Sequence, residues 1–223
     1  MIYRSLLYVP ADNQKFIEKA HLRGADAIIL DLEDAVRQEN KSQARKNLTV
    51  SVKLCKQSGA GIFVRINTKK TDAFKDAEAA LLAGATGLYV PKAHAKRLRQ
   101  LHKFLRPLEK ENRLPRLAIV ALIEDAKGVL QAQKIASQKR VIALTLGVED
   151  YANDIGAAAD PDVLRLPKQL VHLAAKSKGL MSFGLFRSVA NYSEISEIKA
   201  AALEAKRFGF DGASCVHPSV VKL

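Results

Sequence analysis

The segment GADAIILDLED, residues 24–34, contains the three parts of one structural unit. A glycine opens the segment, an apolar run covers residues 27–32, and acidic side chains come at the end of that run. Short runs rich in isoleucine and leucine are typical of buried strands. Glycine most easily takes the left-handed conformation that ends a helix. The segment therefore predicts a turn out of a helix, a buried strand and a charged loop.

The same unit recurs along the chain, because short apolar runs alternate with longer amphipathic stretches. Two stretches with helical spacing, residues 71–83 and 193–208, are each followed by a glycine, Gly84 and Gly209. Strands that alternate with helices predict βα units and a parallel sheet. The expected strands cover residues 5–9, 27–32, 61–66, 87–90, 117–123, 141–146, 181–183 and 212–215.

Eight strands with right-handed crossovers predict a closed (β/α)8 TIM barrel, and we expect one domain over residues 1–223. An open doubly wound sheet more usually has five or six strands. Only a short segment follows the eighth strand and ends at Leu223. We therefore expect the eighth helix and a C-terminal lid to be truncated, with that part of the wall open or covered by another subunit.

Composition fits a soluble protein with one large hydrophobic core, because 48% of the 223 residues are hydrophobic. The two cysteines, Cys55 and Cys215, form no metal-binding or disulfide motif, which favours a reducing compartment. The N-terminal apolar run ends at Pro10 and is too short for a signal sequence or a membrane span. We expect a cytoplasmic protein that does not associate with membranes.

The net charge of +13 raises the question of nucleic-acid binding. The basic residues are distributed over expected helix faces, without a nucleic-acid motif or an aromatic platform among them. We therefore favour a solvated helical surface over a nucleic-acid surface. An anionic thioester carrier would also be attracted to such a chain.

Charged and polar residues follow the expected strands at their C-terminal ends, where α/β barrels place their active sites. Carboxylates at these positions can also cap helices, and we expect Asp12, Asp34 and Asp125 to be caps. His217, just before a proline, is more often structural than catalytic. The other polar residues at the strand ends or just after them are Asp31, Glu33, Arg65, Asn67, Lys92, Glu124, Glu149 and Asp150.

Glu124 and Asp150 follow adjacent strands and offer hard oxygen ligands, which suit magnesium. Glutamate is a weak helix cap, so a functional role is favoured for Glu124, whereas Asp150 also fits the start of a helix. Arg65 could contact a substrate carboxylate or stabilise an enolate oxygen. Together these residues indicate metal-assisted carbonyl chemistry.

The chain resembles the citrate lyase β-subunit-like enzymes within the HpcH/HpaI aldolase superfamily, over nearly its whole length. The motifs that carry the resemblance are RSLLYVP at 4–10, GADAIILDLEDAV at 24–36, KSQAR at 41–45, VRIN at 64–67, YVPK at 89–92, LIE at 122–124, LGVED at 146–150 and VHP at 216–218.

The resemblance implies a magnesium-dependent carbon–carbon lyase that cleaves or forms a citryl-, malyl- or citramalyl-type thioester. The products would be an acetyl thioester and a 2-oxo acid such as oxaloacetate, glyoxylate or pyruvate. It also implies coenzyme A or an acidic acyl carrier protein as thioester carrier, and a homo-oligomer. The implied roles are metal binding for Glu124 and Asp150, catalysis for Arg65, Glu33 and Asp31, substrate binding for Arg65, Gly147 and Glu149, and thioester-cofactor binding for Tyr8, Pro10 and Lys15.

Three positions depart from the family pattern. Asp125 follows Glu124 where relatives usually have threonine. The segments FGL at 183–185 and PKQ at 167–169 stand where relatives usually have an aspartate and an arginine. The expected absence of a lid leaves open a thioesterase or an aldolase acting on a free 2-oxo acid. The departures leave open a non-catalytic subunit that binds a carrier protein or a 2-oxo acid.

Overall fold

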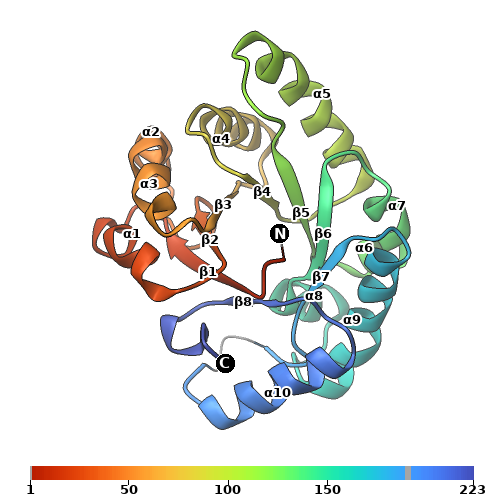
Figure 1. Cartoon of the computed structure of the whole chain (residues 1–223). Helices are drawn as coiled ribbons and strands as arrows, with labels where there is room; N and C mark the ends of the chain where they lie inside the picture. The colour runs from red at the N-terminus through yellow and green to blue at the C-terminus, as the bar shows by residue number, and fades with distance from the viewer. Residues whose placement is uncertain (1, 189–191) are drawn as a thin grey trace.

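The computed structural model describes residues 2–188 and 192–223, and the strands in this part of the chain form a barrel (Figure 1). All eight described strands are parallel, in the order β7-β6-β5-β4-β3-β2-β1-β8. This arrangement confirms the predicted (β/α)8 barrel. The strands are β1 (Ser5–Pro10), β2 (Ala27–Asp31), β3 (Gly61–Arg65), β4 (Gly87–Val90), β5 (Ala118–Ile123), β6 (Val141–Leu146), β7 (Met181–Phe183) and β8 (Ala213–Cys215).

The helices lie outside the ring of strands (Figure 1). Within the described residues, no helix is long and apolar enough to cross a lipid bilayer. The helices are α1 (Gln14–Ala20), α2 (Lys41–Lys46), α3 (Leu48–Cys55), α4 (Lys70–Leu82), α5 (Ala95–Glu111), α6 (Ala126–Leu130), α7 (Ala132–Ala136), α8 (Val148–Ile155), α9 (Pro161–Lys176) and α10 (Ile195–Arg207), with short 3-10 helices η1 (His21–Arg23), η2 (Lys56–Ser58) and η3 (Pro218–Val220).

Alternation along the strands divides the apolar side chains between two cores. One cluster fills the barrel interior, and the other, larger cluster packs the outer faces of the strands against the helices. Successive strand residues point to opposite faces, so each strand contributes to both cores. The interior cluster includes Leu6, Ile29, Phe63, Tyr89, Val120, Leu122 and Phe183.

The same alternation sets the direction of the polar residues at the C-terminal rim. Asp31 lies two residues after the interior Ile29, and Glu124 lies two residues after the interior Leu122. Because side chains repeat their direction every second residue, both carboxylates continue an inward-facing row. Strand register also pairs Asp31 with Pro10 on β1 and with Arg65 on β3.

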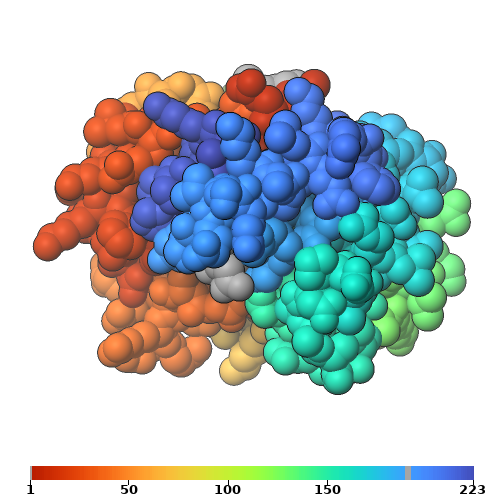
Figure 2. Space-filling model, turned by 90° about the horizontal axis from the view of Figure 1, so that it is seen from below, coloured from red at the N-terminus to blue at the C-terminus, as the bar shows by residue number. Residues whose placement is uncertain are grey.

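Barrel closure depends on the contact of β7 with the start of β8. Phe183 forms a parallel bridge with Gly212, and the Gly184 N–H donates to the Gly212 carbonyl over 2.9 Å. Figure 2 shows the C-terminal segment, in blue, lying between the N-terminal units in red and orange and the cyan segment. After β8 the described chain continues into the short helix η3.

Helix caps agree with the sequence analysis in part. Asp125 caps α6 as predicted, because its carboxylate accepts the Gly128 N–H over 2.5 Å. The prediction for Asp12 was wrong, because the next residue, Asn13, occupies the cap position of α1. Asp12 instead accepts a hydrogen bond from the Asn40 amide. His217 has the predicted structural role, as its ring accepts the Ser219 N–H at the start of η3.

Gly212 provides a test of barrel closure. An added Cβ would lie 2.5 Å from the Arg4 carbonyl oxygen and closer still to that of Tyr3, so the backbone would have to move. We expect Gly212→Ala to lower the free energy of unfolding by more than about 2 kcal/mol in urea titrations. Gly179→Ala is the control, because its Cβ meets open space and its positive φ alone costs about 1 kcal/mol. Equal losses would contradict this account of closure.

Candidate active site

A cavity of about 500 Å³ opens at the C-terminal ends of the strands. The cavity brings together eight of the ten residues that the sequence analysis assigned to the site. The two other residues do not line the cavity. Lys15 lies on the exposed side of α1, and Glu33 contacts the lining residue Arg65. The predicted residues in the lining are Tyr8, Pro10, Asp31, Arg65, Glu124, Gly147, Glu149 and Asp150.

Arg65 and Asp31 form a two-pronged ion pair on neighbouring strands. Arg65 Nε donates to Asp31 Oδ1 over 2.7 Å, and Nη2 donates to Oδ2 over 2.5 Å. Asp31 also accepts backbone N–H groups from Glu33 over 2.8 Å and from Ala35 over 3.1 Å. With each carboxylate oxygen holding two donors, Asp31 fixes the guanidinium plane and the loop after β2 together.

The third nitrogen of Arg65 contacts two further carboxylates. Nη1 lies 2.9 Å from Asp34 Oδ2 and 3.2 Å from Glu33 Oε2. Asp34 is therefore not the predicted helix cap, because no helix begins there and its carboxylate pairs with Arg65 instead. The guanidinium carbon also lies over the Tyr8 ring, 5.2 Å from its centre. At this distance a cation–π interaction stabilises the position of the guanidinium group.

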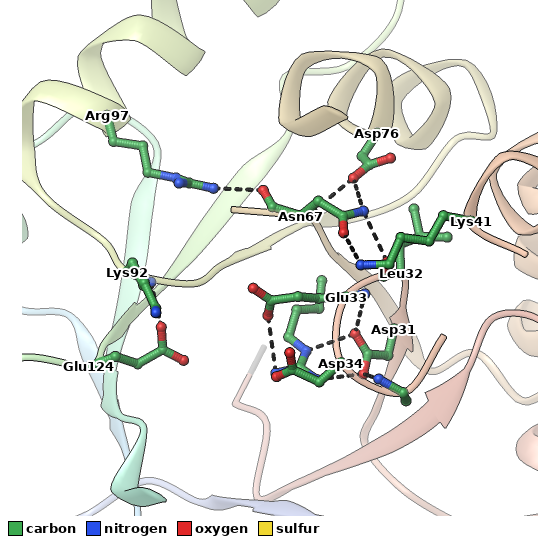
Figure 3. Close-up of polar contacts among 12 residues, drawn as sticks. Asp31, Leu32, Glu33, Asp34, Lys41, Asn67, Asp76, Lys92, Arg97 and Glu124 are labelled. Atoms are coloured by element: carbon green, nitrogen blue, oxygen red, sulfur yellow. Dashed lines mark hydrogen bonds and ion pairs between the residues drawn. The ribbon is translucent and has the colours of Figure 1, made fainter. Parts of the chain in front are cut away.

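Glu33 is held in its protonated form by its surroundings. Burial raises the pKa of Glu33 to about 8, with the charge of Arg65 opposing and those of Asp34 and Glu124 adding to the effect. At neutral pH the carboxyl therefore carries a proton. In Figure 3, Glu33 lies between Asp31 and the pair formed by Lys92 and Glu124.

Glu124 is anchored through one oxygen, because the Lys92 backbone N–H donates to its Oε2 over 2.6 Å. Lys92 takes a positive φ of 46° there, a strained conformation that the surrounding structure must enforce. Burial is the main cause that raises the pKa of Glu124 to about 7, and the charge of Asp150 adds to it. A Cβ on Gly147 would lie 2.6 Å from Glu124 Cγ, so only glycine leaves room for this carboxylate.

Hydrogen bonds around Asn67 support the strand end that carries Arg65 (Figure 3). The Asn67 amide donates to the Leu32 carbonyl over 2.9 Å and to Asp76 Oδ2 over 2.8 Å, and it accepts from Lys41 over 2.5 Å. Arg97 donates to the Asn67 carbonyl over 2.7 Å. These contacts connect the loops after β2 and β3 with helices α2, α4 and α5, so several elements support the charged rim.

Magnesium fits the residues present at this rim. Glu124 and Asp150 line the same cavity, and the charge of Asp150 acts on Glu124. Across the part of the chain that the structure describes, no group of three or more His, Cys, Asp or Glu side chains is arranged to hold a metal. A metal here would have two carboxylate ligands, and Mg²⁺ commonly binds one or two carboxylates and completes its shell with water and substrate oxygens.

Comparison with known proteins gives the family. The family model described as HpcH/HpaI aldolase/citrate lyase matches residues 4–218. This chain belongs to that family. It is also 30% identical over 226 residues to a (3S)-malyl-CoA thioesterase of Cereibacter sphaeroides, covering 99% of this chain and 75% of that protein.

Solved structures of the family have the same barrel. The citrate lyase beta subunit of Mycobacterium tuberculosis, complexed with oxaloacetate and magnesium, aligns with a TM-score of 0.82 and 26% identity, over 99% of this chain and 94% of that one. The protein CitE of the same organism, in complex with magnesium, acetoacetate and coenzyme A, aligns with a TM-score of 0.79 and 26% identity, over 99% and 79%.

Four further residues in the cavity wall, Tyr89, Thr145, Lys168 and Ser214, were not predicted as site residues. Tyr89, Thr145 and Ser214 continue the inward rows of β4, β6 and β8, and the Tyr89 and Ser214 hydroxyls lie 2.9 Å apart. Alternation along those strands was a signal that could have found them. Lys168 had no such signal, because a lysine in an amphipathic helix is expected to face solvent.

Asp31 and Asp34 provide a matched test of the Arg65 cluster, because both contact Arg65 but differ in exposure. The Asp31 side chain is 2% exposed, and that of Asp34 is 68% exposed. We expect Asp31→Asn to lower the free energy of unfolding by about 3 kcal/mol, since it leaves a largely buried cation poorly paired. Asp34→Asn should cost less than about 1 kcal/mol. Urea titrations at pH 7 measure both, and a larger loss for Asp34→Asn would refute the assignment.

Proposed function

We propose that this chain is a magnesium-dependent carbon–carbon lyase. It cleaves a citryl-, malyl- or citramalyl-type thioester to an acetyl thioester and a 2-oxo acid. The observation that carries the proposal is the convergence of Glu124, Asp150 and the Arg65–Asp31 pair on one cavity at the barrel rim. The oxaloacetate- and magnesium-bound relative supports the same class of chemistry.

Glu124 and Asp150 would hold the metal. Magnesium, when bound, supplies a Lewis acid that stabilises negative charge on the substrate oxygens. Gly147 keeps the Glu124 carboxylate in place by leaving it space, and the Lys92 N–H fixes one of its oxygens. The protein thus presents this carboxylate in a defined orientation, which a hard metal ion requires.

Arg65 would stabilise the thioester oxygen as negative charge develops on it. The guanidinium has five N–H groups, and hydrogen bonds to Asp31 and Asp34 occupy three of them. The second hydrogen of Nη2 can be donated to the substrate. Because Asp31 holds the guanidinium plane, this donor is oriented before the reaction starts, and no energy is lost in reorganisation. Asp31 is accordingly a positioning residue.

Glu33 would supply the proton that converts the departing thioester enolate to an acetyl group. The cleavage breaks the bond between the hydroxyl-bearing carbon and the thioester methylene. The hydroxyl proton leaves to water as the ketone forms, and the methylene carbon takes up one proton, which water would afterwards restore to Glu33. Glu33 carries a proton at neutral pH because burial raises its pKa. A carboxylic acid with a pKa near the working pH is an effective general acid.

The thioester carrier would be coenzyme A or an acidic acyl carrier protein. Tyr8 and Pro10 form the wall of the cavity at β1, and Lys15 lies on the adjacent helix α1. The coenzyme A complex of CitE supports the first carrier, and the net charge of +13 suits either anionic one. The proposal also includes a cytoplasmic location and assembly of the protein into a homo-oligomer.

Thioester hydrolysis is the second candidate, because the chain is 30% identical to a (3S)-malyl-CoA thioesterase. The same cavity would then bind a malyl thioester, and water would attack its carbonyl carbon. Arg65 would stabilise the tetrahedral oxyanion in place of the enolate. The two reactions differ in their products, since hydrolysis leaves the four-carbon acid intact whereas cleavage gives a 2-oxo acid.

Removing either predicted metal ligand tests the proposal. We expect Glu124→Gln and Asp150→Asn each to lower magnesium-dependent release of acetyl thioester at least about 100-fold, because the Lewis acid would be lost or displaced. Magnesium binding, followed by calorimetry, should weaken in parallel. Glu111→Gln, at the exposed end of α5, is the control and should leave both unchanged.

Product identification decides between the two candidates. Citryl-, malyl- and citramalyl-CoA are incubated with the protein and magnesium, and the carbon skeletons are identified by mass spectrometry. A 2-oxo acid with acetyl-CoA supports the lyase, and an intact hydroxy acid with free coenzyme A supports the thioesterase. Full release of acetyl-CoA by both metal-ligand variants would overturn the magnesium-dependent lyase.

The pH profile tests the role of Glu33. Because its folded pKa is about 8, we expect kcat/KM to fall about tenfold per pH unit above pH 8, where Glu33 loses its proton. Glu33→Gln should lower kcat about 100-fold or more and remove that limb of the profile. A limb near pH 8 that persists in the variant would assign the proton to another group.

A further inference from the structure

Lys168 is a buried lysine in the wall of the candidate active site. It comes from α9, which packs against β6 and β7, and it is 4% exposed. Lysine is almost never fully buried without a partner, because its charge is costly to remove from water. Its side chain lines the same cavity as Arg65, Glu124 and Asp150.

The ammonium group of Lys168 contacts backbone carbonyls rather than carboxylates. Nζ donates to the Leu185 carbonyl and, over 3.3 Å, to the Arg187 carbonyl. Among residues 2–188 and 192–223, no carboxylate forms an ion pair with it. An ammonium group has three donors, so these two contacts leave one for a ligand.

Lys168 differs from the other cationic side chains of the cavity in its ion pairing. Three cationic side chains line the cavity: Arg65, Lys168 and Arg187. Arg65 pairs with the carboxylates of Asp31 and Asp34 and contacts the Glu33 carboxyl group, and Arg187 pairs with Glu197 over 2.5 Å. Within the described residues, Lys168 is the lining cation without a carboxylate partner. Buried charges are normally paired, so an anionic group of the substrate would complete the site.

We propose that Lys168 binds the second carboxylate of a dicarboxylic substrate, so that the site selects a four-carbon diacid over the corresponding monocarboxylic acid. The inference rests on the proposed function and names its substrate class. Cleavage of a citryl thioester gives oxaloacetate, which has two carboxylates, whereas malyl and citramalyl thioesters give the monocarboxylates glyoxylate and pyruvate. Lys168 therefore favours the citryl type.

The electrostatic environment of Lys168 agrees with an anionic ligand. Burial lowers the pKa of Lys168 to about 7, and the charge of Glu149 only partly opposes this. A bound carboxylate would favour the charged ammonium form, since an opposite charge nearby stabilises it. Substrate and proton would then bind together at this side of the cavity.

Two stable hydroxy acids, malate and lactate, differ by the one carboxylate in question and serve as probes. Calorimetry with magnesium present gives the ratio of their dissociation constants. We expect the protein to bind malate at least about tenfold more tightly than lactate, as for one charge-assisted hydrogen bond in a buried site. Lys168→Met and Lys168→Gln should reduce this preference to less than about threefold, with lactate affinity unchanged.

Lys134→Met, on the exposed face of α7, is the matched control and should keep the preference. Either Lys168 variant suffices if the other fails to fold. The inference is overturned if the wild-type protein shows no preference for malate, or if a folded Lys168 variant retains it. Absence of activity on all three thioesters would defeat the proposed lyase and thioesterase alike, but the malate preference and its dependence on Lys168 would still be measured.

Discussion

The alternation of side chains along eight parallel strands is the constraint on which the rest of the structure depends. Every second residue must fill the barrel interior, and the residues between must pack under the helices. The inward row of each strand stays apolar until the rim, where Asp31, Arg65 and Glu124 take the next inward positions. One geometric rule thus produces both a dry core and a charged cavity above it.

Charges crowded on that rim change the chemistry of individual groups. The Asp31–Arg65 pair is fixed by four hydrogen bonds to Asp31, so neither side chain is free to reorient. Glu33 and Glu124 are buried beside other carboxylates, and both have raised pKa values. Asp31 therefore pairs with Arg65 as a carboxylate, whereas burial allows Glu33, which also contacts Arg65, to hold a proton at neutral pH.

Membership in the HpcH/HpaI aldolase/citrate lyase family places this chain between two chemistries, because its relatives include a citrate lyase beta subunit and a malyl-CoA thioesterase. In both reactions an acidic substrate is bound while negative charge develops on its thioester oxygen. The two differ in which bond breaks, and this depends on where the cavity holds the acid. A buried cation in the same cavity wall, such as Lys168, would set that position through the second carboxylate of the substrate.

The sequence alone determined the barrel, the strand positions and the rim, because apolar runs ended by charged residues are local patterns that a parallel barrel must repeat. It also identified Arg65, Glu124 and Asp150 as residues at the strand ends or just after them. Only the tertiary structure showed that Asp34 pairs with Arg65 instead of capping a helix, and that Asn13 takes the cap expected of Asp12. The burial of Lys168 was likewise decided in three dimensions, because α9 turns that residue toward the cavity and local periodicity does not record which charged residue a helix buries.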